Sequence, residues 1–215
     1  MSVVETVVVG AGGHGKVVAD CALRENRVVA GFLDDDPGKA GATVLGLPVL
    51  GTLGWLGSQS RASIELVLAI GANDQRARIA EQIARLGFKL HTAVHPSATV
   101  AVSAHLGMGC VVLANAVVNA EASVGPGAII NTGAIIEHDA VVERFAHVSP
   151  NATVGGAARV GELAQLGIGA TMLPMTTIGA GAIAGAGAVV IRDIAAGAVA
   201  VGVPARIIRQ QREDA

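Results

Sequence analysis

An apolar residue recurs every six positions along the second half of the chain. Stepping by six from Val94 to Val190 meets Val, Ile, Leu or Met at every position except Ala184. A small residue, usually Ala, follows four positions after most of them. Neither the helical period of 3.6 nor strand alternation gives a six-residue repeat. A chain that turns a corner every six residues does, so the repeat predicts a parallel β-helix with three faces and eighteen residues per coil.

The first half has a different pattern, in which short apolar runs alternate with helical stretches. This alternation favours a small parallel α/β sheet. The expected strands are 6–9, 28–33 and 64–70, and the expected helices are 17–24 and 75–86. The predicted fold class is therefore a Rossmann-like α/β domain, residues 1–90, followed by a β-helix domain, 91–193, and a C-terminal tail, 194–215.

A glycine-rich loop follows the first expected strand. Gly10, Gly12 and Gly15 satisfy the G-x-G-x-x-G pattern, and acidic residues follow about twenty positions later. Such loops place phosphates at a helix N-terminus. Ninety residues leave no room for a nicotinamide half, so a nucleotide-sugar diphosphate is the expected ligand. The expected substrate-binding residues here are Gly12, Gly13, His14, Lys16, Asp34 and Asp35. The alternative is that the glycines only permit tight packing and the aspartates cap a turn.

Composition excludes several classes of protein. The net charge is −2 and no basic run is present, so a nucleic-acid partner is not expected. Residues 163–191 lack Asp, Glu, Lys and Arg, but their Gly and Pro content argues against a membrane helix. Cys21 and Cys110 fall in different expected domains, which argues against a disulfide, and the first residues do not resemble a signal peptide. We expect a cytoplasmic protein.

Two histidines stand out in the repeat. Because Ile136 points inward, His138 and Asp139 should lie at the next corner and project outward, whereas His147 should face out from a flat side before Val148. The two histidines are half a coil apart, so they could serve one site only across a subunit boundary, which favours a homo-oligomer. Gly156 follows His138 by one full coil and should stack on it. The alternative is that His138 is a solvated corner residue.

Several motifs in series now resemble a known family. They are the loop 10–16, the strand end 69–73, His-Pro-Ser at 95–97, Ile-Asn-Thr at 130–132, the His138–Asp139 pair, His-Val-Ser-Pro at 147–150 and Gly-Val-Pro-Ala-Arg at 202–206. Together they resemble the sialic-acid O-acetyltransferase-like family of hexapeptide-repeat acyltransferases. That family includes bacterial enzymes that N-acetylate 4-amino-4,6-dideoxy sugars on UDP or GDP. The resemblance implies a left-handed β-helix and a homotrimer with active sites between subunits.

The resemblance also implies roles for individual residues. His138 would be the general base, Asp139 its orienting partner, and Gly156 the donor of an oxyanion-binding N–H. Asn73 and Asn131 would contact the nucleotide sugar. The residues implied to bind acetyl-CoA are His147, Gly156, Ile168, Ala186 and Pro204.

The predicted function is thus acetyl-CoA-dependent N-acetylation of the 4-amino group of a nucleotide-linked sugar in bacterial glycan biosynthesis. A sugar O-acetyltransferase is the first alternative and a non-catalytic β-helix scaffold the second. No metal is expected, because His138 and His147 lack a third outward ligand in matching register. The sequence leaves the base, the sugar, the acyl-chain length and the kinetic order open.

Overall fold

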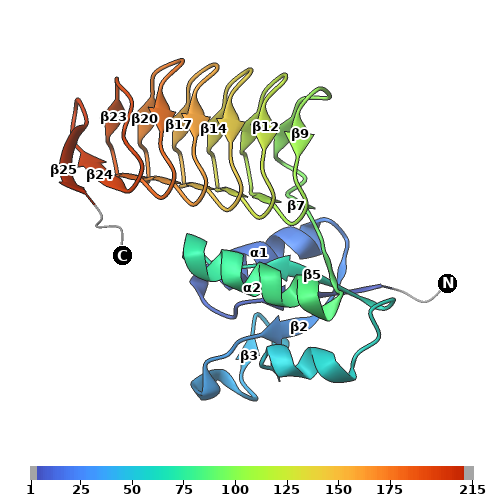
Figure 1. Cartoon of the computed structure of the whole chain (residues 1–215). Helices are drawn as coiled ribbons and strands as arrows, with labels where there is room; N and C mark the ends of the chain where they lie inside the picture. The colour runs from blue at the N-terminus through green and yellow to red at the C-terminus, as the bar shows by residue number, and fades with distance from the viewer. Residues whose placement is uncertain (1–3, 211–215) are drawn as a thin grey trace. The chain divides into compact units, whose positions relative to one another are not determined.

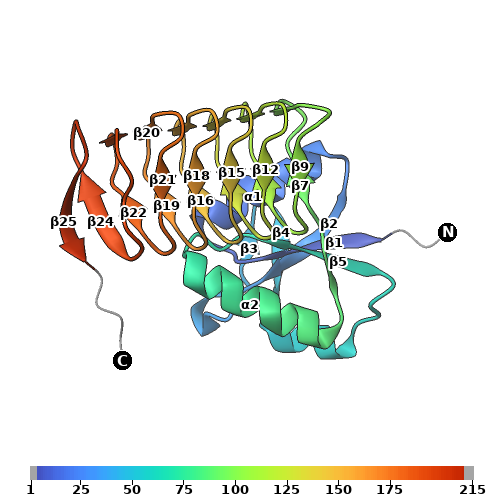
Figure 2. The ribbon, with the colours of Figure 1, turned by 45° about the horizontal axis from the view of Figure 1, so that its top comes forward.

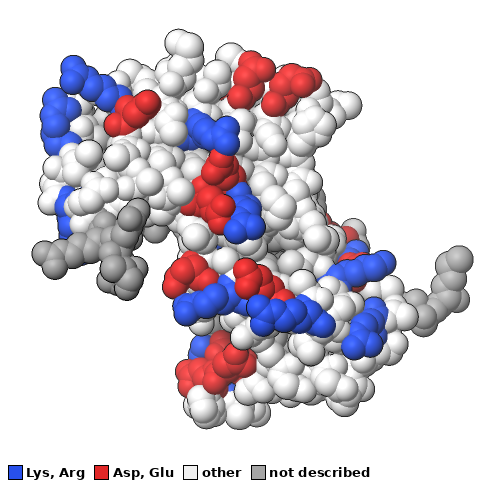
Figure 3. Space-filling view, in the orientation of Figure 1, with Lys and Arg blue, Asp and Glu red and all other residues white. Residues whose placement is uncertain are grey.

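The computed structural model describes residues 4–210 and divides between Pro96 and Ser97 into two compact units (Figure 1). Figure 3 shows acidic and basic side chains intermixed over the visible face. No helix within residues 4–210 is both long enough and apolar enough to cross a membrane.

The N-terminal unit is built on one six-stranded sheet in the order β3-β4-β2-β1-β5-β6. Its strands are β1 (Glu5–Val9), β2 (Val28–Leu33), β3 (Thr43–Val44), β4 (Leu47–Gly51), β5 (Ile64–Leu68) and β6 (Lys89–Leu90), with β7 (Ala93–Val94) following. All neighbours are parallel except β3 and β4, which form an antiparallel hairpin. β1 lies in the middle, and the chain order reverses between β1 and β5. Such a reversal is the usual ligand-binding edge of an open α/β sheet.

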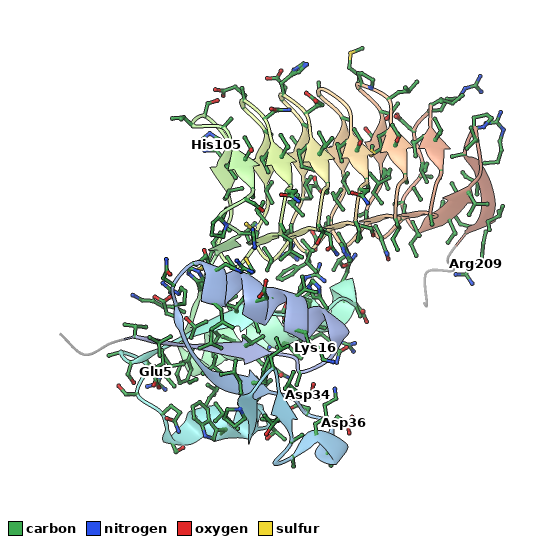
Figure 4. The ribbon with its side chains drawn as sticks, turned by 180° about the vertical axis from the view of Figure 1, so that it is seen from behind. Glu5, Lys16, Asp34, Asp36, His105 and Arg209 are labelled. Carbon is green, nitrogen blue, oxygen red and sulfur yellow. The ribbon has the colours of Figure 1, made fainter. Side chains whose placement is uncertain are left out.

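Two α-helices, α1 (Gly13–Arg24) and α2 (Asn73–Leu86), cover opposite faces of this sheet (Figures 1 and 4). Right-handed crossovers in opposite directions from β1 and β5 require this arrangement. Helix α1 begins at Gly13 rather than at the expected Val17, because the glycine loop itself forms the first helical turn. Helix α2 ends at Leu86, and Gly87 follows it in the left-handed conformation typical of a helix C-terminus. Two short 3-10 helices, η1 (Pro37–Lys39) and η2 (Leu53–Ser58), complete the unit.

The second unit is a parallel β-helix of very short strands in three sheets (Figures 1 and 2). The first sheet begins at β7 and contains β10 (Val111–Val112), β13 (Ile129–Ile130), β16 (His147–Val148), β19 (Gln165–Leu166) and β22 (Ile183–Ala184), and a terminal hairpin extends it beyond β22. The second contains β8 (Thr99–Val100), β11 (Val117–Val118), β14 (Ile135–Ile136), β17 (Thr153–Val154), β20 (Thr171–Met172) and β23 (Val189–Val190). The third contains β9 (His105–Leu106), β12 (Ser123–Val124), β15 (Val141–Val142), β18 (Arg159–Val160) and β21 (Thr177–Ile178).

Register confirms the eighteen-residue coil. Ile129 pairs with His147, and Ile135 pairs with Thr153 in the next coil. The inward residues of the six-residue repeat are at most 2% exposed from Val112 to Val190. Burying a side chain of this size contributes about 1.5–3 kcal/mol, so the stack of Val, Ile and Leu is the main source of stability in this unit.

The corners of the β-helix repeat as regularly as its interior. Every sixth residue from 109 to 187 has a positive φ, between 54° and 70°. Some of these residues are Gly, but the set also contains Asn115, Glu121, Asp139, Phe145, Asn151, Ala157, Leu163 and Met175. A positive φ costs most L-residues about 1–2 kcal/mol, and Asn and Asp tolerate it best. The packed coils impose the conformation even where the side chain disfavours it.

The β-helix ends with a change of pattern. β24 (Ala198–Val201) pairs parallel with β22, but Ile183 meets Val199, so the last coil is shorter than the others. β25 (Arg206–Gln210) then runs antiparallel to β24. The predicted tail, 194–215, therefore begins with a terminal hairpin, and its residues 211–215 lie outside the described part of the chain.

Candidate active site

A pocket of about 460 Å³ opens at the carboxyl ends of β1, β2 and β5 in the N-terminal unit. Gly12, Asp34, Asp35, Asp36 and Lys39 are among its lining residues, together with residues of η2 and the first turns of α2. Figure 4 shows Lys16, Asp34 and Asp36 at the same end of this unit. The pocket thus occupies the edge at which the chain order of the sheet reverses, where an α/β sheet usually binds its ligand.

The glycines of the loop divide into two groups. A Cβ at Gly15 would lie 2.0 Å from the Gly10 carbonyl oxygen, and one at Gly10 would lie 2.7 Å from the Ala69 oxygen. These two glycines are required by packing, as the alternative interpretation supposed. A Cβ at Gly12 or Gly13 would meet nothing within 4 Å. The packing of the unit leaves these two positions open, so a ligand has room to approach the backbone there.

Both carboxylate oxygens of Asp34 accept hydrogen bonds from other residues around the pocket. Its Oδ2 accepts hydrogen bonds from the Ala11 N–H and from Lys39 Nζ, both at 2.8 Å, and its Oδ1 accepts from the Asp36 N–H at 3.0 Å. Partial burial alone would raise the pKa of Asp34, but the bond from Lys39 and the two backbone bonds outweigh it and hold the pKa below its usual value. The ionised carboxylate therefore ties the glycine loop to η1.

The two following aspartates each use one oxygen. Asp35 Oδ1 accepts from the Leu53 N–H at 3.1 Å, and Asp36 Oδ1 caps η1 by accepting from the Gly38 N–H at 2.9 Å. Within residues 4–210 the second oxygen of each carboxylate makes no hydrogen bond. One oxygen of each carboxylate therefore stabilises a turn, as the alternative interpretation supposed. The other oxygen of Asp35 and of Asp36 remains a hydrogen-bond acceptor at the pocket.

The other predicted substrate residues of this unit do not line the pocket. Gly13 and Lys16 lie on the exposed side of the first turn of α1. Burial, followed by the charge of Arg76, lowers the pKa of His14 to about 4, so this histidine is neutral at pH 7. Asn73 accepts a hydrogen bond from Arg76 Nη2 at 2.9 Å.

His138 and Asp139 occupy a corner of the β-helix after β14, as predicted. Both side chains are exposed, at 65% and 60%. Nδ1 of His138 lies 2.7 Å from Oδ2 of Asp139. A carboxylate accepts only, so Nδ1 carries the proton and Nε2 keeps its lone pair. The hydrogen bond that His138 donates to Asp139 raises the pKa of His138 above its ordinary value.

Gly156 lies against this imidazole. A Cβ at Gly156 would stand 2.7 Å from Nε2 of His138, closer than van der Waals contact allows. The glycine is itself buried, and its N–H donates no hydrogen bond within residues 4–210. The predicted stacking of Gly156 on His138 is therefore present, and a backbone donor lies beside a potential base.

Asn131 and His147 form a second pair, in the first sheet of the β-helix. His147 begins β16 and pairs with Ile129 of β13, so Asn131 lies two residues further along the neighbouring strand. Nδ2 of Asn131 is 3.0 Å from Nε2 of His147. The resemblance assigned these residues to different ligands, whereas the structure joins them by a hydrogen bond. His138, which follows β14, belongs to another sheet.

The predicted acetyl-CoA residues follow one edge of the β-helix. Ile168 and Ala186 are exposed corner residues after β19 and β22, the strands that continue the sheet of His147. The Gly187 N–H donates to the Ile168 carbonyl, which joins these two corners. Pro204 is exposed in the loop of the terminal hairpin, after a cis peptide bond.

Comparisons with known proteins cover both units. Residues 5–83 match the PglD N-terminal domain family. A UDP-N-acetylbacillosamine N-acetyltransferase of Bacillus subtilis is 38% identical over 122 residues, which span 50% of this chain and 50% of that protein. The acetyltransferase domain of PglB from Neisseria gonorrhoeae is 43% identical with a TM-score of 0.91, and the match covers 95% of this chain and 99% of that one.

The chain belongs to the PglD family of nucleotide-sugar N-acetyltransferases, of the hexapeptide-repeat type. A perosamine N-acetyltransferase from Caulobacter crescentus, solved as a histidine variant with CoA and GDP-perosamine, is 40% identical with a TM-score of 0.92. That match covers 96% of this chain and 97% of the other. The PglB domain has also been solved with acetyl coenzyme A.

Family membership confirms the resemblance and the fold class that the sequence predicts, an α/β unit followed by a left-handed β-helix. It also confirms, at the level of the family, acetyl-CoA-dependent N-acetylation of nucleotide-linked 4-amino sugars. The domain limits and the roles of individual residues remain predictions. Within residues 4–210 there is no group of three or more His, Cys, Asp or Glu side chains that could hold a metal ion.

Arg76 and Lys39 were missed by the sequence analysis. Arg76 is fully buried and donates to the carbonyls of Ile70 and Gly71 as well as to Asn73. Burial lowers the pKa of its guanidinium to about 10. Arg76 lies in the first turn of α2, where the sequence gives no sign that the side chain turns inward. Lys39 follows a Pro-Gly turn and resembles an ordinary surface lysine.

Proposed function

We propose that this protein transfers the acetyl group of acetyl-CoA to the 4-amino group of a UDP- or GDP-linked 4-amino-4,6-dideoxy sugar, with His138 as the base. The observation that carries the proposal is the His138–Asp139 pair beside Gly156, in a chain whose solved relatives match along nearly its whole length. Those relatives include complexes with acetyl coenzyme A and with GDP-perosamine.

The reaction requires a neutral amine, because an ammonium has no lone pair. The amine nitrogen attacks the thioester carbonyl carbon, and Nε2 of His138 accepts the proton that the nitrogen loses. The C–S bond then breaks, and the sulfur of CoA leaves as a thiolate that takes up a proton. The Gly156 N–H is the donor we assign to the oxyanion of the tetrahedral intermediate. Asp139 fixes the tautomer that leaves Nε2 free to act.

The nucleotide is assigned to the pocket of the N-terminal unit. The open backbone at Gly12 and Gly13, together with the N-terminus of α1, suits a diphosphate. The remaining oxygens of Asp35 and Asp36 suit N–H or O–H donors of the base and ribose. Uracil and guanine both offer such donors, so the pocket alone does not choose between UDP and GDP.

Acetyl-CoA is assigned to the edge marked by His147, Ile168, Ala186 and Pro204. We propose that the active protein is a homotrimer, because His138 and His147 lie on different sheets of one β-helix and a neighbouring copy would bring them to one site. We also place the reaction in the cytoplasm, where acetyl-CoA is available as the donor.

Replacing His138 with Ala tests the chemical step. We expect kcat to fall about 10²–10⁴-fold, with the KM for acetyl-CoA within about twofold of wild type. Parallel assays with UDP- and GDP-linked 4-amino sugars, and with free sialic acid as an O-acetyl acceptor, identify the substrate by mass spectrometry. Near-normal turnover in the variant would exclude His138 as the base, and acetylation of sialic acid alone would exclude the N-acetyltransferase.

A further inference from the structure

The pocket of the α/β unit is acidic, although the ligand that we assign to it is an anion. Asp34, Asp35 and Asp36 line the pocket, and Lys39 is the one cation among the described residues that do so. Negative charges held close together repel one another. A nucleoside diphosphate therefore needs a cation nearby to offset the three carboxylates, and Lys39 is the residue placed to supply it.

Lys39 is held at the edge of the pocket by Asp34. It is the last residue of η1, and its Nζ donates to Oδ2 of Asp34 at 2.8 Å. The same oxygen accepts the N–H of Ala11 at 2.8 Å. The ammonium therefore lies within about two hydrogen-bond lengths of the glycine loop, beside the open backbone of Gly12 and Gly13.

The ammonium of Lys39 has hydrogen-bond donors to spare. The side chain of Asp34 is 13% exposed, whereas that of Lys39 is 35% exposed, so the ammonium remains accessible from the pocket. Within residues 4–210 the bond to Asp34 is its one hydrogen bond, and an ammonium has three donors. That bond also raises the pKa of Lys39 above its usual value, so the group is charged at neutral pH.

We propose that Lys39 binds the diphosphate of the nucleotide sugar, and that Asp34 is a positioning residue that holds the ammonium beside the glycine loop. Asp34 follows β2, at the position where a related sheet would bind ribose, but here its carboxylate anchors a cation instead. The remaining donors of Lys39 and the backbone N–H groups of Gly12 and Gly13 then serve the same phosphates. The inference rests on the proposed function for the class of ligand, a nucleoside diphosphate.

Lys39→Met tests the contact, because it removes the charge and keeps an unbranched side chain. We expect the Kd for UDP or GDP, measured by titration calorimetry without acetyl-CoA, to rise about ten- to a hundredfold, as the loss of a charged hydrogen bond implies. The Kd for the matching nucleoside, uridine or guanosine, should change little by ligand-observed NMR. A merely distorted pocket would lose both ligands alike, so equal losses would overturn the proposal, as would an unchanged Kd for the diphosphate.

Lys39→Arg and Lys89→Met complete the set. Lys39→Arg keeps the charge and the donors, so it should retain most of the affinity for the diphosphate. Lys89 is exposed in β6 and pairs with Glu65 near the start of β5, whereas the pocket lies at the other end of that strand. Lys89→Met should bind UDP or GDP as the wild type does. A loss equal to that of Lys39→Met would mean that net charge, and not a contact, governs binding.

The binding assays separate this proposal from the proposed reaction. With the nucleotide sugar as substrate, Lys39→Met should raise the KM by the factor seen for the diphosphate and leave kcat nearly unchanged. If His138→Ala retained turnover while Lys39→Met still lost UDP or GDP selectively, the assigned base would be wrong and the role of Lys39 would stand. If acetyl transfer proceeded as described but the affinity for the diphosphate did not depend on Lys39, only the role of Lys39 would fail.

Discussion

The two units of this protein place their functional groups by different means. In the β-helix, the position of a side chain follows from its number, since residues eighteen apart lie side by side and every sixth residue turns a corner. In the α/β unit, the pocket is formed by loop ends whose hydrogen bonds bring together residues far apart in sequence, such as Asp34 and Ala11. In the periodic unit, the relative positions of site residues can therefore be worked out from their residue numbers. In the unit whose pocket is made of loops, they cannot.

The largest effect that this comparison predicts is at Gly156. Its φ does not lie in the left-handed region, and the three atoms nearest to an added Cβ all belong to the exposed His138 side chain. Gly156→Ala should displace the imidazole, lower kcat by about 10²-fold as an oxyanion or base defect does, and leave the melting temperature nearly unchanged. Kinetic assays and thermal unfolding measure the two quantities.

Gly161→Ala is the control for this prediction. Its Cβ would lie 2.7 Å from the backbone nitrogen of Ala180 in the next coil, which cannot move aside. Such overpacking typically costs about 1–3 kcal/mol, so this variant should melt earlier. Loss of stability without loss of activity in Gly156→Ala would show that Gly156 serves the coil and not the histidine.

Arg76 offers the corresponding test in the α/β unit. Arg76→Met leaves the carbonyls of Ile70 and Gly71 without their donor, and a buried unsatisfied group costs about 1–3 kcal/mol. Because Ile70 lines the pocket, the KM for the nucleotide sugar should rise by roughly tenfold, as a shift of this size in binding energy implies. The KM for acetyl-CoA should stay within about twofold.

The exposed Arg78, paired with Asp74 on the same helix, is the matched control, since such pairs contribute about 0–1 kcal/mol. Arg78→Met should alter neither KM. If Arg76→Met folds too poorly for assay, Arg76→Lys retains the charge and has an ammonium group that can still donate hydrogen bonds. Equal increases in both KM values would argue that Arg76 only supports the fold.

A smaller effect is expected from Asp139→Asn, which removes the charge but keeps an acceptor for Nδ1 and a residue that tolerates positive φ. His138 must be neutral to accept a proton, so activity is lost as pH falls through its pKa. Asp139 raises that pKa, so its loss should bring the pKa back toward about 6.5. The acid limb of kcat/KM should move to lower pH, while the plateau falls modestly. An acid limb that stays in place would show that Asp139 does not tune the base.

The smallest effect is expected at a corner residue to which we assign no catalytic or binding role. Met175 is 79% exposed and has a φ of 61°, a conformation that glycine adopts without strain. Met175→Gly should stabilise the β-helix slightly, by up to about 1 kcal/mol after the entropy of glycine is subtracted. Urea unfolding measures the difference. A destabilised variant would mean that the Met side chain contributes packing that its exposure conceals.

The sequence predicted the site residues of the β-helix better than those of the α/β unit. Counting by six placed His138, Asp139 and Gly156 correctly, and the same arithmetic could have found the Asn131–His147 contact. One coil separates His147 from Ile129, and a two-residue step along a strand keeps the same side. In the α/β unit, the G-x-G-x-x-G pattern predicted the pocket but not the role of each residue in it. Asp34 has the sequence position of a ribose ligand, yet its oxygens are taken by Ala11, Asp36 and Lys39.

The terminal hairpin has a consequence for assembly. A parallel stack with an eighteen-residue repeat offers its last coil as a template on which another chain could continue, end to end, as in a fibre. Here β24 has already left the common register, and β25 runs in the reverse direction along the rim of the first sheet. The first coil of a second chain would need a parallel strand at each of three edges, and at one of them it would meet the antiparallel β25. The reversed strand therefore opposes end-to-end continuation of the β-helix by a second chain.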